Sequence, residues 1–304
     1  MSETLRLRAG RRTVEIRRPG KRLFPEDGPT KADLAAYQLR IAPYLLPELR
    51  GRPLMLERLP EGVGGTPHFM QKDTPDHYPQ WVHRVELKKE GGTVVHTLCE
   101  NTATLVFLAD QACLTLHRWL SRADRPDHPD RLVFDLDPPG SDFAAAREAA
   151  YRLRELLDRL RLPARLMSTG SRGLHVIVPL DGRASFDDSR AFAHDVAEVL
   201  AARHPDSLTT AVRKEARGER LYLDVQRNAY AQTAVAPWSV RAEREAPVAV
   251  PLTWDQLDEP GLGPRDWSLR ELDAVLELAA RKPWSGTFRG RSLGPARRRL
   301  ERLR

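Results

Sequence analysis

Short runs of alternating hydrophobic and polar residues are interleaved along this chain with longer runs of helical periodicity. Alternation around Gly10 predicts a hairpin over residues 4–17. Apolar runs bounded by glycine or proline predict strands over 131–137, over 221–224 and on both sides of the turn 169–173. Apolar positions at helical spacing predict helices over 143–162, 186–203 and 268–281. Strands and helices that intermix in this way predict an α/β or α+β fold.

Capping residues and prolines predict where one helix near the N-terminus begins and ends. Thr30, with Asp33 three residues later, resembles a capping box, so a helix is expected to start there and to run through Leu39. Pro43 and Pro47 are expected to interrupt its continuation, because proline lacks the backbone N–H of a helical hydrogen bond.

The composition is that of a globular protein from a reducing compartment. Hydrophobic residues make up 41% of the chain and charged residues 30%. No run of about 18 apolar residues is present, and the first residues lack the apolar core of a secretory signal, so no membrane partner is expected. Cys99 and Cys113 are too few for a disulfide framework, which favours the cytoplasm.

The net charge of +7 is concentrated at the two ends of the chain. Residues 1–22 and residues 286–304 each carry +6, which leaves −5 for the body between them. Basic ends neutralise phosphates and favour nucleic acid, although they also serve to keep a protein in solution. Residues 286–304 are expected to form either a short helix or a linker.

Ser141 or Asp142 is expected to cap the helix that starts at 143.

Two aspartates end the strand over 131–137. Asp135 and Asp137 are two residues apart, and alternate positions on a strand point to the same face, so both carboxylates project together. Ionised carboxylates this close repel each other unless a cation or a shared proton intervenes. A third aspartate, Asp224, ends the strand over 221–224. The aspartates indicate a metal site, while two solvated acids before a turn remain the alternative for the pair taken alone.

The turn over 169–173 combines groups that bind anions. Thr169, Ser171 and Arg172 offer hydroxyls and a guanidinium, the glycines allow a tight turn with exposed N–H groups, and His175 begins the next strand. Such a turn is suited to cradling phosphate oxygens. Most turns of this composition only reverse the chain, so the turn alone leaves both interpretations open.

Histidine and cysteine residues within 96–117 have spacings that occur in zinc sites. His96 precedes Cys99, and Cys113 precedes His117. The residues between these pairs are apolar and of helical periodicity, without the turns of a zinc knuckle. We therefore expect both cysteines to pack in a core.

Several motifs together resemble the polymerase domain of bacterial DNA ligase D, an enzyme of non-homologous end joining in the archaeo-eukaryotic primase superfamily. They are KRLFPEDGPTK (21–31), PHFMQK (67–72), LCENTATLVFLA (98–109), LTLHRW (114–119), FDLDPP (134–139), STGSRGLHV (168–176), LDVQRNAYAQTAVAPWSVRA (223–242) and WDQL (254–257). The resemblance implies an α+β (mixed α/β) fold of the primase type, in which helices flank a central, mainly antiparallel sheet that carries the carboxylates. It also implies a single polymerase domain over 1–285, with a DNA-end-binding part over 1–110, a catalytic core over 111–285 and a basic tail over 286–304.

The family transfers nucleotides from nucleoside triphosphates (NTP or dNTP) to a primer 3′-hydroxyl, and the resemblance assigns residues to that reaction. Asp135, Asp137 and Asp224 match the catalytic carboxylates that hold two divalent cations, Mn²⁺ or Mg²⁺. The residues that match nucleotide-binding positions are His117, Thr169, Ser171, Arg172, His175, Gln226 and Arg241. Arg172 stands where the family often has lysine, a change that keeps the positive charge.

The same resemblance implies DNA as a partner. Lys21 and Lys31 match lysines that hold the 5′-phosphate beside a gap, and Phe69, expected in a loop, matches an aromatic residue near the template. Arg18 stands where the family commonly has asparagine. Without the resemblance, two exposed lysines and a phenylalanine over a small core would need no function. The implied function is templated gap filling and end joining in double-strand break repair, with ribonucleotides preferred, in the cytoplasm at the nucleoid.

Other interpretations stay open at this point. A Ku-type end-binding protein and a separate ligase are expected partners by analogy. Motifs of a ligase or nuclease are absent, so either a stand-alone polymerase or one excised domain is expected. The alternatives are a primase that starts chains de novo, a non-catalytic DNA-end-binding module and a metal-dependent glycosyltransferase, of which the last explains neither Asp224 nor the basic ends.

Overall fold

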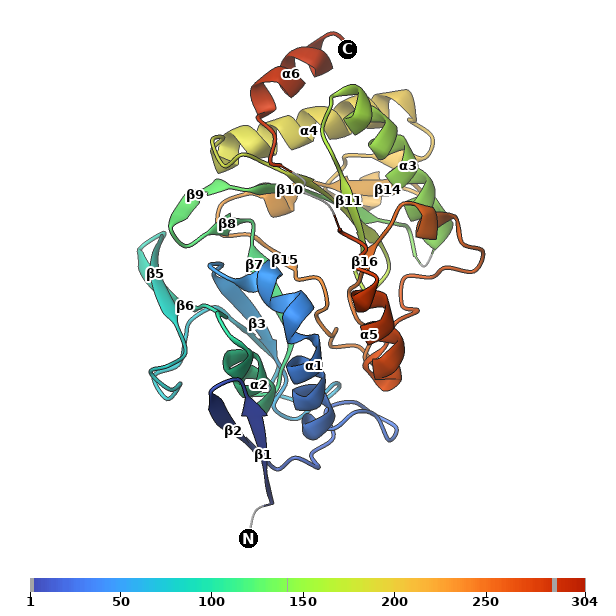
Figure 1. Cartoon of the computed structure of the whole chain (residues 1–304). Coiled ribbons are helices and arrows are strands. Elements are labelled where there is room, and N and C mark those ends of the chain that lie inside the picture. The colour runs from blue at the N-terminus through green and yellow to red at the C-terminus, as the bar shows by residue number, and fades with distance from the viewer. Residues whose placement is uncertain (1–2, 141, 286–288, 304) are drawn as a thin grey trace. The chain divides into compact units, whose positions relative to one another are not determined.

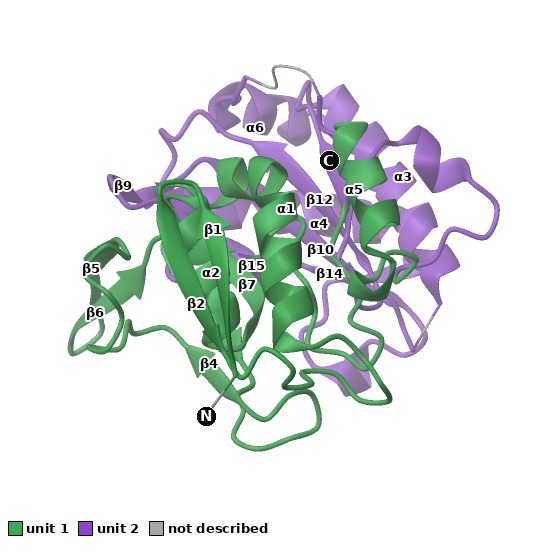
Figure 2. Cartoon of the chain, turned by 60° about the horizontal axis from the view of Figure 1, so that its bottom comes forward, with its two compact units in different colours: residues 1–119, 235–250, 265–283 green, residues 120–234, 251–264, 284–304 purple. Residues whose placement is uncertain are grey.

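The computed structural model describes residues 3–140, 142–285 and 289–303 (Figure 1). Backbone contacts divide the chain into two compact units (Figure 2). Unit 1 comprises residues 1–119, 235–250 and 265–283, and unit 2 comprises residues 120–234, 251–264 and 284–304. Both units are discontinuous in sequence, and the predicted division into 1–110, 111–285 and 286–304 stays a prediction. Ser141, a predicted cap, lies outside the described residues, as do residues 286–288 and 304 of the basic tail.

Unit 2 is built on a six-stranded sheet with the order β13-β14-β10-β12-β11-β16. Its strands are β10 (Arg131–Asp137), β11 (Arg165–Ser168), β12 (Leu174–Pro179), β13 (Leu208–Thr209), β14 (Leu221–Asp224) and β16 (Pro251–Leu252). The pairs are antiparallel, except that β13 runs parallel to β14. The predicted mixed fold with a mainly antiparallel sheet is therefore confirmed.

Amphipathic helices cover this sheet. α3 (Phe143–Arg159) and α4 (Phe186–Arg203) contact each other and β10, and Figure 1 shows them together on one side of the strands. The predicted cap is confirmed, because the Asp142 side chain accepts the N–H of Ala145. Leu132, Phe134 and Leu136 of β10 are fully buried and share one face, which is the face that apolar helix residues can cover. The aspartates at alternate positions of β10 project to the opposite face.

The remaining elements of unit 2 are short. They are β8 (Ser121–Arg122), β9 (Arg125–Pro129), α6 (Leu293–Glu301) and three single 3₁₀ turns over Lys214–Ala216, Gln226–Asn228 and Asp255–Asp258. Helix α6 buries Leu293, Ala296 and Leu300 and contacts α4. The described part of the basic tail therefore includes a packed helix, one of the two predicted forms.

Unit 1 combines small sheets with three helices. Its strands are β1 (Thr4–Ala9), β2 (Arg12–Arg17), β3 (Leu54–Arg58), β4 (Phe69–Gln71), β5 (Arg84–Lys89), β6 (Gly92–Thr97), β7 (Cys113–Trp119) and the last residue of β15 (Thr233–Val235). Its helices are α1 (Lys31–Leu49), α2 (Thr102–Asp110) and α5 (Leu272–Ala280), the last preceded by a 3₁₀ turn over Leu269–Glu271. The hairpin β1–β2 and helix α5 confirm two sequence predictions. None of the described helices is long and apolar enough to cross a membrane.

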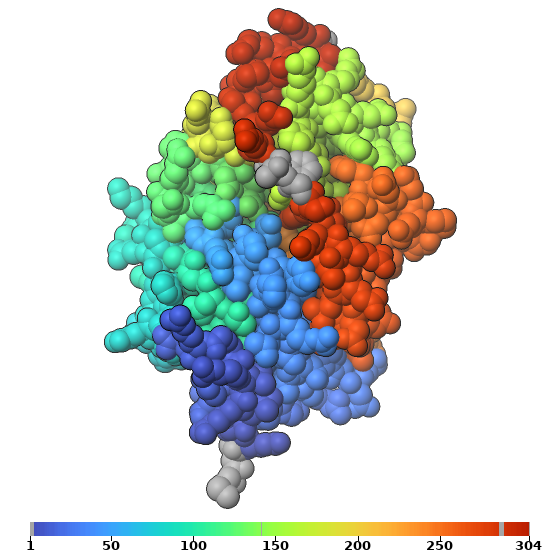
Figure 3. Space-filling view, viewed as in Figure 1, coloured from blue at the N-terminus to red at the C-terminus, as the bar shows by residue number. Residues whose placement is uncertain are grey.

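Helix α1 corrects the predicted effect of two prolines. Its capping box of Thr30 and Asp33 is present as expected, but the helix continues past Pro43 and Pro47 to Leu49. A proline inside a helix costs about 3 kcal/mol, because it removes one hydrogen bond and crowds the preceding turn. Here the buried side chains that follow Pro43 hold the helix together, since α1 packs against α2 and α5 within unit 1. The surfaces of α1 and α5 lie side by side in the space-filling view (Figure 3).

A glycine before β12 allows the turn over 169–173 to lie against β10. A Cβ on Gly173 would lie 2.1 Å from the carbonyl oxygen of Leu136, and a backbone atom cannot move away as a side chain can. We expect Gly173→Ala to lower the free energy of unfolding by about 3 kcal/mol, as in overpacked cores, when measured by urea denaturation. The control is Gly20→Ala, since a Cβ on Gly20 meets no atom within 4 Å. Equal stability of the two variants would contradict this account.

Candidate active site

Three neighbouring strands of unit 2 set a row of ionisable side chains across the sheet. The register of β12, β10 and β14 puts His175 opposite Asp135, and Asp135 opposite Asp224. Residues opposite each other on adjacent strands share a face, so these side chains lie side by side. Asp137 is two residues further along β10, opposite Tyr222, and faces the same way. The structure therefore brings all three predicted carboxylates to one face of the sheet.

Two arginines neutralise Asp137. Arg172 Nη2 lies 2.8 Å from Asp137 Oδ1, and Arg217 Nη1 lies 3.7 Å from Oδ2. Arg172 was a predicted site residue, whereas Arg217 was not, because nothing in the sequence distinguishes it from the other arginines. The two guanidiniums relieve the repulsion that an isolated pair of carboxylates on one strand would suffer.

The negative charges of Asp135 and Asp224 are balanced by nearby basic groups to different extents. Two basic groups lie near Asp135, with His175 Nε2 at 3.5 Å and Arg227 Nε at 3.6 Å from its oxygens. Burial raises the pKa of the Asp224 carboxyl, and although the Gln226 N–H at 2.8 Å lowers it, the charge of Asp135 raises it again. The two aspartates therefore repel each other, which is the situation that a bound cation relieves.

Tyr222 and Gln226 flank Asp224 and connect it to Arg217 and to one further arginine. The Tyr222 hydroxyl lies 3.5 Å from Asp224 Oδ1, and the guanidinium of Arg217 lies 3.8 Å from the centre of the Tyr222 ring. The side chain of Gln226 accepts a hydrogen bond from Arg190. Gln226 was a predicted nucleotide-binding residue, and the structure sets it beside the carboxylates.

The donor chemistry of the three aspartates fits a hard divalent cation. In the part of the chain that the structure describes, no three His, Cys, Asp or Glu side chains converge closely enough to hold a metal ion. Asp135 and Asp137 instead direct their oxygens to basic groups, as described above. Carboxylate oxygens without sulfur or several imidazoles suit Mg²⁺ or Mn²⁺ better than zinc. The residues present therefore fit a metal that would exchange places with the arginines.

The described residues give no support to the zinc interpretation of residues 96–117. Neither cysteine belongs to a group of three possible ligands there. Both cysteines are buried and free, so the predicted core packing is confirmed. Burial raises the pKa of the Cys113 thiol to about 12 and that of Cys99 well above its usual range, which keeps both thiols protonated.

The turn over 169–173 is held by hydrogen bonds of its own. Thr169 donates from both its N–H and its hydroxyl to the carbonyl oxygen of Gly173, at 3.1 and 3.0 Å. The N–H of Ser171 donates to the Thr169 hydroxyl, and that of Gly170 to a neighbouring serine. The N–H groups of Thr169, Gly170 and Ser171, which were expected to face a phosphate, therefore form hydrogen bonds within or next to the turn. The Arg172 guanidinium, half-exposed beside Asp137, is the group that the turn presents to the carboxylates.

Two predicted nucleotide-binding residues of unit 1 gather around a glutamate that the sequence analysis missed. Glu57 Oε2 lies 4.0 Å from His117 Nε2, and Oε1 lies 3.1 Å from His68 Nε2. Burial acts to raise the pKa of Glu57, but the neighbouring His117, a hydrogen bond with Thr115 and the charge of Arg241 lower it to about 2. Glu57 is therefore a negative charge that lies beside the His117 ring.

The two predicted DNA-binding lysines have different surroundings. Lys31 is not the exposed lysine suggested by the sequence, since it is only 5% exposed and donates to the backbone oxygen of Asp110 at 2.8 Å. It lines a cavity of about 630 Å³ in unit 1. Lys21 instead pairs with Glu61 at 2.7 Å. The structure therefore sets Lys31, and with it Arg18, in a cavity wall.

Phe69 belongs to the short strand β4 rather than to the expected loop. Its side chain is 42% exposed and its neighbour Met70 is 47% exposed, so neither covers a small core. The guanidinium of Arg58, which lines the same cavity as Lys31, lies 5.9 Å from the Phe69 ring. An exposed aromatic ring beside a guanidinium is suited to stacking on a nucleic-acid base.

A mainly antiparallel sheet with three aspartates beside cationic groups suits a metal-dependent nucleotidyltransferase. The chain belongs to the LigD primase-polymerase domain family, whose sequence model matches residues 30–284. Members of this family are polymerases that add nucleotides, and this chain is one of them. Its structure is similar to the polymerase domain of Mycobacterium tuberculosis ligase D in complex with DNA, with a TM-score of 0.81 and 32% identity. That match covers 87% of this chain and 93% of the other.

Curated relatives carry names that refer to end joining. The chain is 33% identical over 252 residues to the "Multifunctional non-homologous end joining protein LigD" of Mycolicibacterium smegmatis, a match that covers 82% of this chain and 33% of the relative. It is 32% identical over 280 residues to the protein of that name from Pseudomonas aeruginosa, covering 91% of this chain and 33% of the relative. The chain therefore spans about a third of the length of these relatives.

The ionised state of Glu57 gives a pH-dependent contribution to stability. Its pKa in the folded protein, about 2, lies below the usual 4.5, so the contribution is complete above pH 4.5 and is lost as the pH falls towards 2. We expect Glu57→Gln to unfold more easily than the wild type by on the order of 2 kcal/mol at pH 7. The difference should shrink towards zero at pH 2 in urea denaturation curves. A difference that is constant across this range would contradict the assigned pKa.

Proposed function

We propose that this chain is a template-dependent polymerase that fills gaps and extends primer 3′ ends during non-homologous end joining, with ribonucleotides preferred. The observation that carries the proposal is the pair of Asp135 and Asp224 opposite each other, with Asp137 on the same sheet face. The names of the relatives, and a similar polymerase domain that binds DNA, support it. Its partners would be DNA with 5′-phosphates, nucleoside triphosphates, a Ku-type protein and a ligase, in the cytoplasm at the nucleoid.

The three aspartates would hold two divalent ions, Mn²⁺ or Mg²⁺. Ions bound there would neutralise the triphosphate and lower the pKa of the primer hydroxyl. Asp137 must then exchange its contacts with Arg172 and Arg217, which lie 2.8 and 3.7 Å away. Once released, the planar guanidinium of Arg172 can donate two hydrogen bonds to a phosphate. The same arginine would in this way neutralise the site before binding and the triphosphate after it.

The other nucleotide-binding roles follow from the same proposal. Glu57 keeps the His117 ring in one orientation, so His117 can contact the nucleotide sugar, while Arg241 adds a cation for the phosphates. The unit 2 residues that we assign to nucleotide binding are Thr169, Ser171, Arg172, His175 and Gln226. The residues that we assign to DNA binding are Lys21, Lys31 and Phe69, and we propose that residues 1–285 act as one polymerase domain with a basic tail.

Removal of one carboxylate tests the catalytic assignment. We expect Asp135→Asn or Asp137→Asn to reduce nucleotide incorporation about 1,000-fold or more, because stabilisation of the transferring phosphate by bound ions amounts to several kcal/mol. Binding of a primer–template duplex, measured by fluorescence anisotropy, should weaken by no more than about twofold. Each change removes a negative charge, which would otherwise repel the DNA phosphates. The control is Asp158→Asn on the exposed surface of α3. Full activity of either site variant would refute the assignment.

A gapped duplex tests the role in end joining. We expect single-nucleotide incorporation with Mn²⁺ to be about tenfold stronger when the gap carries a 5′-phosphate, because hydrogen bonds to a charged group contribute about 1.5–3 kcal/mol. The preference should be lost in the Lys21→Ala/Lys31→Ala double variant and kept in Lys282→Ala, which removes an exposed lysine at the end of α5. Ribonucleotides and deoxyribonucleotides are compared in parallel.

Each other outcome of this assay has a definite meaning. Incorporation that is indifferent to the phosphate would contradict end recognition and leave a general gap-filling polymerase. Dinucleotide synthesis on an unprimed template would identify a primase. Tight DNA binding without any incorporation would identify a non-catalytic end-binding module.

A further inference from the structure

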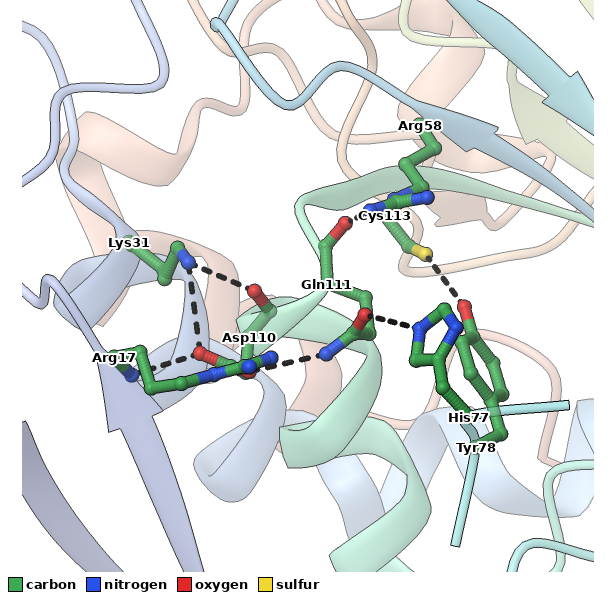
Figure 4. Close-up of polar contacts among 8 residues, drawn as sticks. All are labelled: Arg17, Lys31, Arg58, His77, Tyr78, Asp110, Gln111 and Cys113. Carbon is green, nitrogen blue, oxygen red and sulfur yellow. Dashed lines mark hydrogen bonds and ion pairs between the residues drawn. The ribbon is translucent and has the colours of Figure 1, made fainter. Parts of the chain in front are cut away.

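Asp110, the last residue of α2, joins two cations in the wall of the unit 1 cavity (Figure 4). Its carboxylate accepts hydrogen bonds from Nε and Nη2 of Arg17 at 3.1 and 2.7 Å, and from the Arg17 backbone N–H at 2.8 Å. Lys31 Nζ lies 2.8 Å from the backbone oxygen of Asp110 and 3.5 Å from its carboxylate. Asp110 is itself 4% exposed. One buried residue therefore contacts both cations, Arg17 through its carboxylate and Lys31 mainly through its backbone oxygen.

The cavity carries an excess of positive charge. Its charged lining residues are the cations Arg17, Arg18, Lys31 and Arg58 and the acids Glu15 and Asp110. Four cations against two acids leave a net charge of about +2, apart from His77, which also lines the cavity. A phosphate monoester carries a charge between about −1.5 and −2 at neutral pH, with three oxygens that accept hydrogen bonds. Charge and donor chemistry therefore match a terminal phosphate.

The end of helix α2 organises a third cation as well. The backbone oxygen of Gln111 accepts from Arg58 Nε at 2.7 Å. The Gln111 side chain donates to Asp110 at 3.1 Å, and its oxygen lies 3.3 Å from His77 Nε2 (Figure 4). The C-terminal end of a helix carries a partial negative charge, which favours cations nearby. Oxygen atoms of Asp110 and Gln111 thus accept hydrogen bonds from three of the four lining cations.

We propose that Asp110 is a positioning residue for a DNA 5′-phosphate: it holds Arg17 and Lys31 so that their remaining N–H groups face the cavity. This inference rests on the proposed recognition of 5′-phosphates and deepens it. Arg17 uses one edge of its guanidinium on Asp110, and 63% of its side chain stays exposed to meet a ligand. The ammonium of Lys31 has three N–H groups, of which Asp110 accepts at most two.

The sign of the effect separates positioning from simple electrostatics. A phosphate in the cavity is repelled by the charge of Asp110, so if charge alone mattered, Asp110→Asn would tighten phosphate binding. If Asp110 positions the cations, the same change weakens phosphate binding despite the more favourable net charge. The asparagine amide presents N–H groups to the guanidinium or the ammonium, and these donors cannot pair with cations.

The test compares two gapped duplexes that differ only in a 5′-phosphate or a 5′-hydroxyl at the gap. Dissociation constants are measured by fluorescence anisotropy for the full chain as wild type, Asp110→Asn and Glu48→Gln. Glu48 is the matched control, because this glutamate of α1 pairs with Arg118 and does not line the cavity. Incorporation on an open primer–template without any downstream strand reports on the polymerase activity separately.

We expect the wild type and Glu48→Gln to bind the phosphorylated duplex at least about tenfold more tightly than the hydroxyl form. In Asp110→Asn this ratio should fall to about two or less, while binding of the hydroxyl duplex and incorporation on the open primer–template stay within about twofold of wild type. An unchanged or increased ratio in Asp110→Asn would overturn the positioning role alone. A wild-type ratio near one would overturn both this role and the proposed end recognition.

A second variant keeps the proposal testable if Asp110→Asn does not fold. Arg17→Gln removes one of the two positioned cations, while the backbone N–H of residue 17, Gln111 and Lys31 still pair with the Asp110 carboxylate, so folding should tolerate the change. We expect its preference for the 5′-phosphate to fall about fivefold, since one charge-assisted contact is lost. A preference equal to that of the wild type would exclude Arg17, and with it the arrangement around Asp110, from phosphate recognition.

Discussion

The repulsion between carboxylates on neighbouring strands is the constraint around which unit 2 is built. Asp135 and Asp224 are directly opposite each other in an antiparallel pair, where like charges destabilise a sheet. The sheet tolerates them because basic groups from three separate segments converge on the same face, among them His175 and Arg217. Each of these pairings uses a carboxylate oxygen that a divalent cation could also bind.

Unit 1 uses the same principle with the signs reversed. The groups that we assign there to DNA and nucleotide binding include cations, and single acidic residues contact them. Asp110 supports Arg17 and Lys31 in the cavity wall, and Glu57 supports His117 on the neighbouring strand β7. Burial strengthens these pairings, because opposite charges interact more strongly away from water. In both units, a group that we assign to substrate or ion binding is paired with a group of opposite charge.

The sequence predicts most of the elements and the carboxylates but few of their partners. The strand that ends in Asp135 and Asp137, the capping box at Thr30 and the helices of unit 2 follow from local patterns, and the structure has all of them. The motifs also identified the family correctly. The end of helix α1 was predicted wrongly, since buried contacts outweigh the local effect of two prolines.

The supporting residues could not be found from the sequence for a different reason. Glu57, Asp110 and Arg217 acquire their roles from pairings between segments far apart in the chain. Asp110 and Arg17, for example, are separated by 93 residues, and nothing near either residue specifies the other. For Glu57 a weak signal exists, because the alternation of β3 with buried Leu54 and Leu56 sets Glu57 on the opposite face. Only the pairing of β3 with β7 shows that His117 shares this face.

The edge strands of the six-stranded sheet in unit 2 bear on whether copies of this protein can pair with one another. The two outermost strands, β13 and β16, are each two residues long, and Pro251 in β16 has no N–H to offer. A short border that includes proline gives a strand from another molecule little to pair with. The long apolar strands β10 and β12 are enclosed between other strands. These two edge strands therefore offer little surface for pairing this sheet with a strand of another copy.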